Sequence, residues 1–346
     1  MYFSVTLACC QTALNKLVIS ILIYYKTKAE DILFTKKMST MALFNRLLIG
    51  IDFTNTDKHI LEHTAALCRY NQPQKVYFVH INDNLDLPEE VRKELYGDVE
   101  PYDEYLKKEM AKTVAESFPE HEQFECEFMV VEGSLLPQML HWAKIKEVDL
   151  AVLGRKSSKG SGIFLTRFAR RATCSVLIVP EHSNNHIDSI LVCNDFSVNS
   201  ELSMQKALEF AVANPETTIY SQNIYTVPVG YHKTGKSFEE FARIMKKHAI
   251  KRYQEFCKRI DFGEKTMVTP IFSLDKHNDT ATLVKNTAES LQAKLIIIGS
   301  KGRTFAASIF LGSFAERMIN KQNEAPLLVV KRKDETLGIM EAIKNL

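Results

Sequence analysis

The sequence predicts an α/β protein built from two doubly wound, five-stranded parallel-sheet domains in tandem. Short apolar runs alternate with helical periodicity over ten or more residues, which favours right-handed crossovers between parallel strands. Several of these runs are nearly continuous in Val, Ile and Leu, as strands covered on both faces require. The whole pattern then occurs a second time, because Asp52-Phe53-Thr54 reappears as Asp195-Phe196-Ser197 after an equivalent apolar run.

The elements of the two halves can be placed in matching order. In each half the first strand ends in the Asp-Phe-Thr/Ser tripeptide, and a helix follows both that strand and the fourth strand. The strands expected in the first half are 46–54, 75–81, 126–133, 149–154 and 175–180. Those expected in the second half are 189–197, 218–224, 266–273, 294–299 and 326–331. Further helices are expected at 88–118 and 135–147, and at 237–260 and 280–292.

These elements predict two domains with an extension at each end. We expect a non-domain extension at 1–40, domains at 41–181 and 187–333, and a tail helix at 334–346. The apolar segment 17–25 is too short for a membrane span, which needs about 20 apolar residues. A signal peptide would require basic residues before its apolar segment, but no Lys or Arg precedes Lys16. An upstream start assignment is the preferred explanation of 1–40, and a cryptic membrane anchor is the alternative.

Composition excludes several classes of protein. The 346 residues are 45% hydrophobic and 25% charged, with a net charge of +2, which is ordinary for a globular chain. That balance gives no sign of a nucleic-acid or membrane partner. The seven cysteines form no Cys-x-x-Cys pair and no zinc spacing, so free thiols in a reducing, cytoplasmic compartment are expected, without a tightly bound metal.

The stretch 295–314, LIIIGSKGRTFAASIFLGSF, carries the clearest functional pattern. Gly299 and Gly302 follow an apolar strand, and Gly312-Ser313 opens the next helix. Glycines permit a positive φ and a close approach of backbone N–H groups to an anion, and a helix N-terminus favours a phosphate. Ligands of doubly wound sheets bind at the carboxyl ends of the strands, where Asp195 also ends its strand. The pattern therefore predicts an anion site beside Asp195.

This pattern resembles the universal stress protein family, whose signature is an Asp ending strand one and Gly-x-x-Gly-(nine)-Gly-Ser/Thr after strand four. The chain is similar to a tandem member over about residues 43–331. The resemblance implies an adenine-nucleotide alpha-hydrolase-like, Rossmann-like fold that holds ATP or AMP, with or without Mg²⁺, in the second domain. It also implies that the fifth strands, 175–180 and 326–331, pair inside the chain, with a homodimer left open. The residues implied to hold the nucleotide are Asp195, Ile224, Gly299, Gly302, Arg303, Gly312, Ser313 and Phe314.

The first half departs from the family signature. Gly154 is kept, but Ser157 replaces the second glycine, and IFLTRFA aligns with IFLGSFA. Thr166 and Arg167 then take the places of Gly312 and Ser313. A β-branched Thr at a helix start tolerates positive φ badly. A long Arg would fill the phosphate position or act as its own counter-charge, so we expect no nucleotide in the first domain.

Three functions remain open from the sequence, one of them a true enzyme of the same nucleotide-binding superfamily. The first is a stress-response protein whose second domain binds an adenine nucleotide in a regulatory role, with slow ATP hydrolysis or self-phosphorylation at most. The second is a nucleotide-independent scaffold that uses its charged helical surfaces, acidic around 86–104 and basic around 233–259, to meet an unknown protein partner.

Overall fold

The computed structural model describes residues 43–86, 88, 90–91, 94, 101–156, 161–181, 183, 185–263, 266–302, 311–321 and 323–332. The description below concerns the unit Ala42–Leu346. The expected extension at 1–40, the expected tail helix at 334–346 and most of 88–100 lie outside the described residues.

The first half forms a parallel five-stranded sheet with the order β3-β2-β1-β4-β5. Its strands are β1 (Arg46–Gly50), β2 (Lys75–Asn82), β3 (Glu125–Glu132), β4 (Leu150–Arg155) and β5 (Ser175–Pro180). The strand order reverses between β1 and β4. Strands β1, β4 and β5 are almost wholly buried, in agreement with their continuous apolar sequence.

The second half repeats this topology with the order β10-β9-β6-β7-β8, again parallel throughout. Its strands are β6 (Ser189–Cys193), β7 (Thr218–Tyr225), β8 (Val268–Leu274), β9 (Leu295–Gly299) and β10 (Leu327–Val330). The predicted strands of both halves are therefore confirmed, with small differences at their ends. No helix in the described part of the chain is long and apolar enough to cross a membrane.

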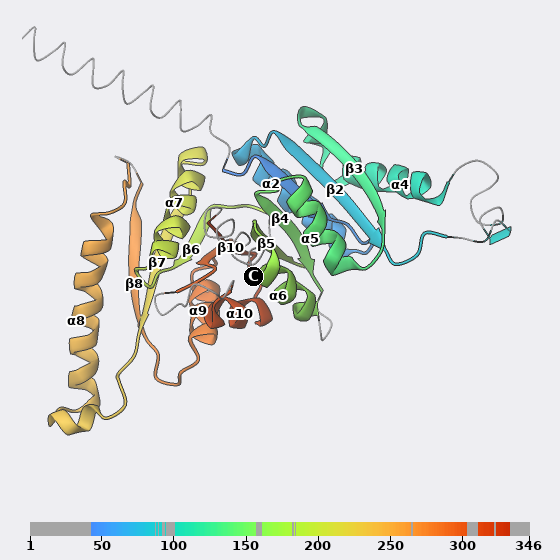
Figure 1. Cartoon of the computed structure of the whole chain (residues 1–346). Helices are drawn as coiled ribbons and strands as arrows, with labels where there is room; N and C mark the ends of the chain where they lie inside the picture. Colours follow the sequence, from blue (N-terminus) through green and yellow to red (C-terminus); the bar gives the residue numbers. More distant parts are fainter. Residues whose placement is uncertain are drawn as a thin grey trace, which may run out of the picture. The chain divides into compact units, whose positions relative to one another are not determined.

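The two sheets join edge to edge into one ten-stranded sheet (Figure 1). The junction is an antiparallel pair of fifth strands, in which Leu328 lies opposite Leu177 and Val329 opposite Val176. The pairing of fifth strands that the resemblance implied is therefore observed within the chain. Because these residues are buried, the junction belongs to the core.

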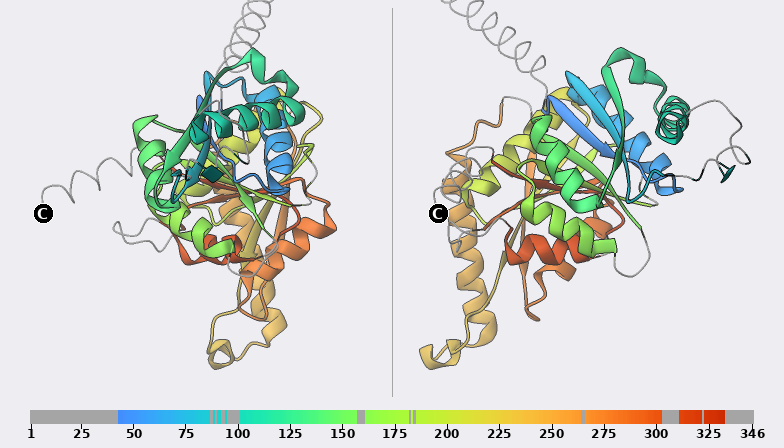
Figure 2. Two further views of the ribbon diagram at one scale, coloured as in Figure 1. Left: turned by 90° about the vertical axis from the view of Figure 1, so that its right-hand side faces the viewer. Right: turned by 45° about the vertical axis from the view of Figure 1, so that its right-hand side comes forward.

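Helices cover both faces of the joined sheet (Figures 1 and 2). One core cluster lies under α2 (Thr56–Asn71), α4 (Tyr102–Ser117), α7 (Val198–Ala213) and α8 (Phe238–Cys257). The other lies under α5 (Leu135–Ile145), α6 (Ser161–Arg171), α9 (Thr280–Ser290) and α10 (Ser313–Asn320). Short 3₁₀ turns, η1 (Pro119–Gln123) and η2 (Tyr231–Thr234), complete the described elements. Both clusters contain residues of both halves, so the halves share a core cluster on each face of the sheet.

Candidate functional site

Asp195 lies just beyond β6, at the carboxyl edge of the second sheet. The chain turns at Phe196, whose φ of 66° is uncommon for a bulky residue. This turn lets the Ser200 hydroxyl of α7 donate to Asp195 Oδ1 at 2.7 Å, while the Ser197 N–H donates to the same oxygen at 3.1 Å. The carboxylate is therefore held in one orientation by its own loop and the first turn of α7. Sequence reasoning missed Ser200.

The three motif glycines have different physical roles. A Cβ at Gly299 would lie 2.8 Å from the Cβ of Asn199, so this glycine lets α7 pack against the end of β9. A Cβ at Gly302 would lie 3.0 Å from Asp195 Oδ2, and one at Gly312 would lie 3.4 Å from the Ser300 carbonyl. Asp195, Gly302 and Gly312 are therefore brought together at one edge of the sheet.

The motif glycines do not use the positive φ that glycine permits. Gly299, Gly302 and Gly312 all lie outside the left-handed region. The reason is that the sharp turn of this edge occurs at Phe196, whereas the glycines supply close approach between neighbouring segments. A Cβ would overlap Asn199 at Gly299 and crowd the end of the Asp195 side chain at Gly302, whereas at Gly312 it would make an ordinary contact with the Ser300 carbonyl.

The N-terminus of α10 faces the same edge without a side-chain cap. Gly312 is the N-cap residue, and its own N–H donates a hydrogen bond to the Ser300 carbonyl at 2.7 Å. Ser313, the next residue, is exposed. The first N–H groups of a helix have no partner within that helix, and they carry its positive dipole end. An anion with several acceptor oxygens suits this position.

The remaining predicted site residues have different outcomes. Ile224 lies near the end of β7, the strand beside β6, and is partly buried against the core. Phe314 also packs against the core from the first turn of α10. Arg303 lies outside the described residues. The described residues contain no cluster of His, Cys, Asp and Glu that could hold a metal ion.

The equivalent edge of the first half is occupied by its own side chains. Asp52 Oδ2 forms an ion pair with Lys156 Nζ at 2.7 Å, and Thr54 Oγ1 donates to Asp52 Oδ1 at 2.5 Å. Partial burial opposes ionisation, but the hydrogen bonds from Lys156 and Thr54 outweigh it and lower the pKa of Asp52. The Asp52 carboxylate is thus already neutralised by a cation of the loop that follows β4.

A second carboxylate replaces Ser200 in the first half. Asp57 stands the same distance after Asp52 as Ser200 stands after Asp195, and both of its oxygens accept the Asp52 N–H at 3.2 Å. Burial raises the pKa of Asp57 to about 6, and the nearby charge of Asp52 adds to this effect. The second half thus has a hydroxyl, Ser200, beside its aspartate, whereas the first half has a second carboxylate, Asp57, in that place. Aligning the two tripeptides could have revealed this exchange from sequence.

Two details of the predicted first-half loop were wrong. Helix α6 begins at Ser161, so Thr166 and Arg167 lie within the helix and not at its start. Arg167 is exposed, and Lys156 supplies the counter-charge that was expected from it. The helix does not break at Thr166, and it therefore starts further back toward β4 than the alignment with α10 predicted.

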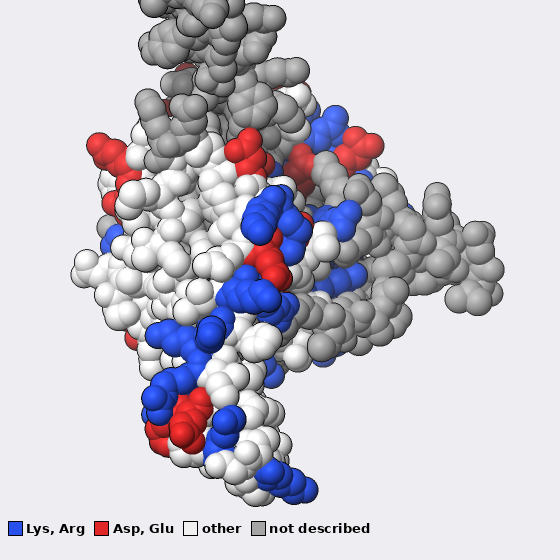
Figure 3. Space-filling model, turned by 90° about the vertical axis from the view of Figure 1, so that its left-hand side faces the viewer, with Lys and Arg blue, Asp and Glu red and all other residues white. Residues whose placement is uncertain are grey.

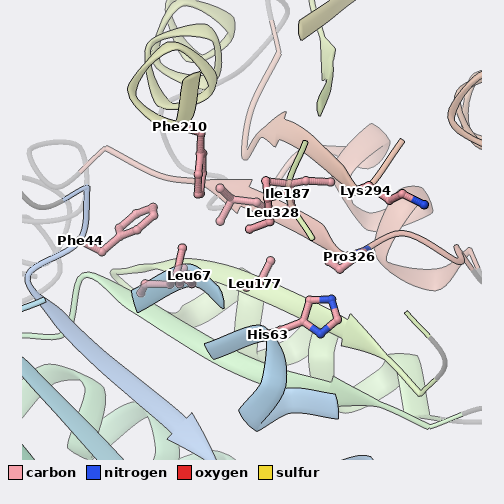
Figure 4. Close-up of a pocket in the computed structure, with 11 residues that line it drawn as sticks. Phe44, His63, Leu67, Leu177, Ile187, Phe210, Lys294, Pro326 and Leu328 are labelled. Atoms are coloured by element: carbon pink, nitrogen blue, oxygen red, sulfur yellow. The ribbon is translucent and has the colours of Figure 1, made fainter. Parts of the chain in front are cut away.

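A small pocket lies elsewhere, in the seam between the halves (Figure 4). Phe44, Leu67 and Leu177 of the first half face Phe210 and Leu328 of the second across it. It has room for about one water molecule. We interpret it as a packing gap of the shared core.

Comparison with known proteins decides the family. The model of the universal stress protein family matches residues 43–180 and, separately, residues 186–331. The chain belongs to the universal stress protein family. Universal stress protein MJ0577 of Methanocaldococcus jannaschii is 29% identical over a match that covers 42% of this chain and 95% of that protein.

Solved structures agree on the fold of this tandem family member. A universal stress protein from Archaeoglobus fulgidus matches with a TM-score of 0.52 and 14% identity, over 83% of this chain and 98% of that chain. Protein PA1789 of Pseudomonas aeruginosa, described as functionally unknown, matches with a TM-score of 0.57 and 14% identity, over 90% and 99% of the two chains. At this identity the likeness concerns the fold alone.

Proposed function

We propose that the second half binds one adenine nucleotide, ATP or AMP, and that the protein acts as a regulator in the stress response. The observation that carries the proposal is the convergence of Asp195, Gly302 and Gly312 at the carboxyl edge of the second sheet. A carboxylate in this position of a doubly wound fold can accept hydrogen bonds from ribose hydroxyls. The uncapped start of α10 suits the phosphates.

The first half supports a stoichiometry of one nucleotide per chain. Its Asp52 is paired with Lys156, and Thr166 and Arg167, which align with Gly312 and Ser313, lie inside α6 and do not start a helix. The five described cysteines are free, and those at 68, 174 and 193 have thiol pKa values raised by burial. Such unreactive thiols fit the proposed action in the reducing cytoplasm.

Calorimetric titration tests the nucleotide proposal with a pair of equivalent variants. ATP, AMP and cyclic AMP are titrated with Mg²⁺ and with EDTA, and binding of ATP or AMP near one site per chain is expected. Asp195→Asn should weaken binding about ten- to hundredfold, because it removes a charged hydrogen-bond acceptor. Asp52→Asn, at the equivalent first-half position, should leave affinity unchanged.

A Gly302→Val, Gly312→Val double variant should abolish binding. The new side chains would contact Asp195 Oδ2 and the Ser300 carbonyl, where the ligand is proposed to lie. Absence of heat with the wild-type protein, or equal affinity of this double variant, would rule out the proposed site.

A specific surface favours the second candidate function, a scaffold that needs no nucleotide. Figure 3 shows Lys and Arg gathered in a band along α8. Within it Arg243, Lys247 and Lys251 follow one another at four-residue spacing, with exposed Ile244 and Ile250 between them. Like charges at this spacing disfavour the helix slightly, so the row suits an acidic partner surface. The basic residues of 233–259 are Lys233, Lys236, Arg243, Lys246, Lys247, Lys251, Arg252, Lys258 and Arg259.

Stress survival of source cells separates the two functions. Reversal of Lys246, Lys247 and Lys251 to Glu should abolish survival if the protein is a scaffold, while ATP affinity stays unchanged. Asp195→Asn should abolish survival if the nucleotide matters. Reversal of three lysines on α4, the equivalent first-half helix, is the control for added negative charge; these lysines are Lys107, Lys108 and Lys112.

A further inference from the structure

The end of α10 opposite the proposed phosphate position is held by the first half. Arg155, the last residue of β4, is 9% exposed and points its guanidinium at the final turn of α10. Its Nη1 donates to the carbonyl of Ile319, and its Nη2 donates to that of Asn320 at 3.0 Å. In the second half the residue after the strand-four glycine is Ser300, so Arg155 has no symmetric counterpart.

Arg155 completes the hydrogen bonding of this helix end. The last four carbonyls of a helix lack intrahelical partners. In α10 the Lys321 N–H reaches the carbonyls of Arg317 and Met318, at 2.9 and 3.3 Å. The Arg155 guanidinium donates to the other two carbonyls, those of Ile319 and Asn320. A cation at a helix C-terminus also interacts favourably with the helix dipole.

Two further contacts tie α6 of the first half to α10. Arg170 forms an ion pair with Glu316, and Thr166 Oγ1 lies 3.5 Å from Asn320 Oδ1. Both contacts lie on more exposed surface than Arg155 and are weaker for that reason. Arg155 is therefore the buried element of a contact that joins the degenerate half to the helix of the proposed site.

Helix α10 is short enough for its two ends to depend on each other. Its eight residues span about 12 Å. Helix formation is cooperative, and short helices are marginal without tertiary support. Fraying at Ile319 and Asn320 would therefore reach the N–H groups that follow Gly312 within two turns.

We propose that Arg155 is a positioning residue through which the first half sets the nucleotide affinity of the second. This inference rests on the proposed function, because the affected site is the one at Asp195 and Gly312. The first half has thus exchanged a ligand site for a contact that controls the ligand site of its neighbour. By reciprocity, a nucleotide at the start of α10 strengthens the Arg155 contact at its end.

Calorimetry with ATP tests the inference on three variants of the full chain. Arg155→Met should lower affinity about tenfold, a typical coupling between sites. Arg155→Lys, which keeps the charge but cannot reach both carbonyls with a rigid fork, should give an intermediate value. Lys206→Met is the matched control. It removes another bond between the halves, from Lys206 Nζ to the Leu43 carbonyl at 2.8 Å, which does not involve α10, and it should leave affinity unchanged.

Hydrogen exchange supplies a readout that a general loss of stability does not imitate. Without nucleotide, amides of 313–320 should exchange faster in Arg155→Met than in wild type, and Lys206→Met should match wild type there. Equal ATP affinity of wild type and Arg155→Met, or equal weakening by Lys206→Met, overturns the inference alone. Absence of ATP binding by the wild type overturns the proposed function and this dependence with it.

Discussion

At the scale of single residues, the two halves differ most clearly in what stands five residues after the strand-one aspartate. Ser200 donates a hydrogen bond to Asp195, whereas Asp57 places a second carboxylate beside Asp52. A hydroxyl can donate a hydrogen bond to a carboxylate without adding charge. A second carboxylate adds a charge, and burial raises the pKa of the one at Asp57. The exchange therefore leaves a titratable group at the edge that we propose has no ligand.

This group predicts a pH-dependent difference between wild type and Asp57→Ser. The pKa of Asp57 is raised from 3.8 to about 6 in the folded state, so its contribution to stability is present at low pH and is lost as pH rises through 6. Relative to the variant, the wild-type free energy of unfolding should be about 1 to 3 kcal/mol larger at pH 4 than at pH 7.5, which means a more stable fold at pH 4.

Urea denaturation at pH 4, 5, 6 and 7.5 measures this difference. Asp86→Ser, a change at an exposed aspartate, serves as the control and should run parallel to wild type. Parallel curves for wild type and Asp57→Ser across the whole range would show that Asp57 does not titrate differently on folding.

At the scale of elements, close packing of helix against strand explains why one glycine is kept in both halves. A Cβ at Gly154 would lie 2.7 Å from the Ile60 and Thr56 side chains of α2, as one at Gly299 would meet Asn199 of α7. This glycine therefore serves the fold in either half. In the alignment of the two halves Ser157 and Thr166 take the places of Gly302 and Gly312, which associates these two glycines with the proposed ligand site instead.

Two alanine substitutions should separate the fold glycine from the site glycine. Gly299→Ala should lower the free energy of unfolding by about 1 to 3 kcal/mol, because its Cβ would overlap backbone as well as side-chain atoms of Asn199. Gly302→Ala meets only the end of the Asp195 side chain and should affect stability less but nucleotide affinity more. Chemical denaturation and calorimetry give the two values, and a larger stability loss in Gly302→Ala would contradict these roles.

Most of the strands and helices were predictable from sequence, because the periodicity that marks them is local. Duplication also allowed each strand to be checked against its copy, as with 75–81 and 218–224. The start of α6 was not predictable in the same way, since the alignment with α10 suggested a break at Thr166 that the chain does not make. The Lys156 and Arg155 contacts were also missed, because they depend on how segments distant in sequence approach one another.

At the scale of the whole molecule, the fifth strands bind the halves into one sheet. Residues 176–178 of β5 and 327–329 of β10 are buried on the line where the halves meet. Separation would expose the edges of both strands, and an unpaired apolar edge is a template for association. The integrity of each half therefore depends on the other.

This dependence predicts the behaviour of the separated halves. Fragments 43–181 and 187–332 should each self-associate or aggregate when expressed alone, and should form a 1:1 complex when expressed together. Size-exclusion chromatography with light scattering measures the masses. Stable, monomeric fragments at micromolar concentration would contradict the importance of the β5–β10 pair.

The β5–β10 junction has a further consequence because it lies within one polypeptide. A junction between separate subunits forms and dissociates with protein concentration, whereas an intramolecular one is always present at high effective concentration. The two halves could therefore accumulate different substitutions while they still pair only with each other, at any protein concentration. Any response to the proposed nucleotide should then follow the level of that nucleotide, and should be insensitive to how many copies of the protein a cell contains.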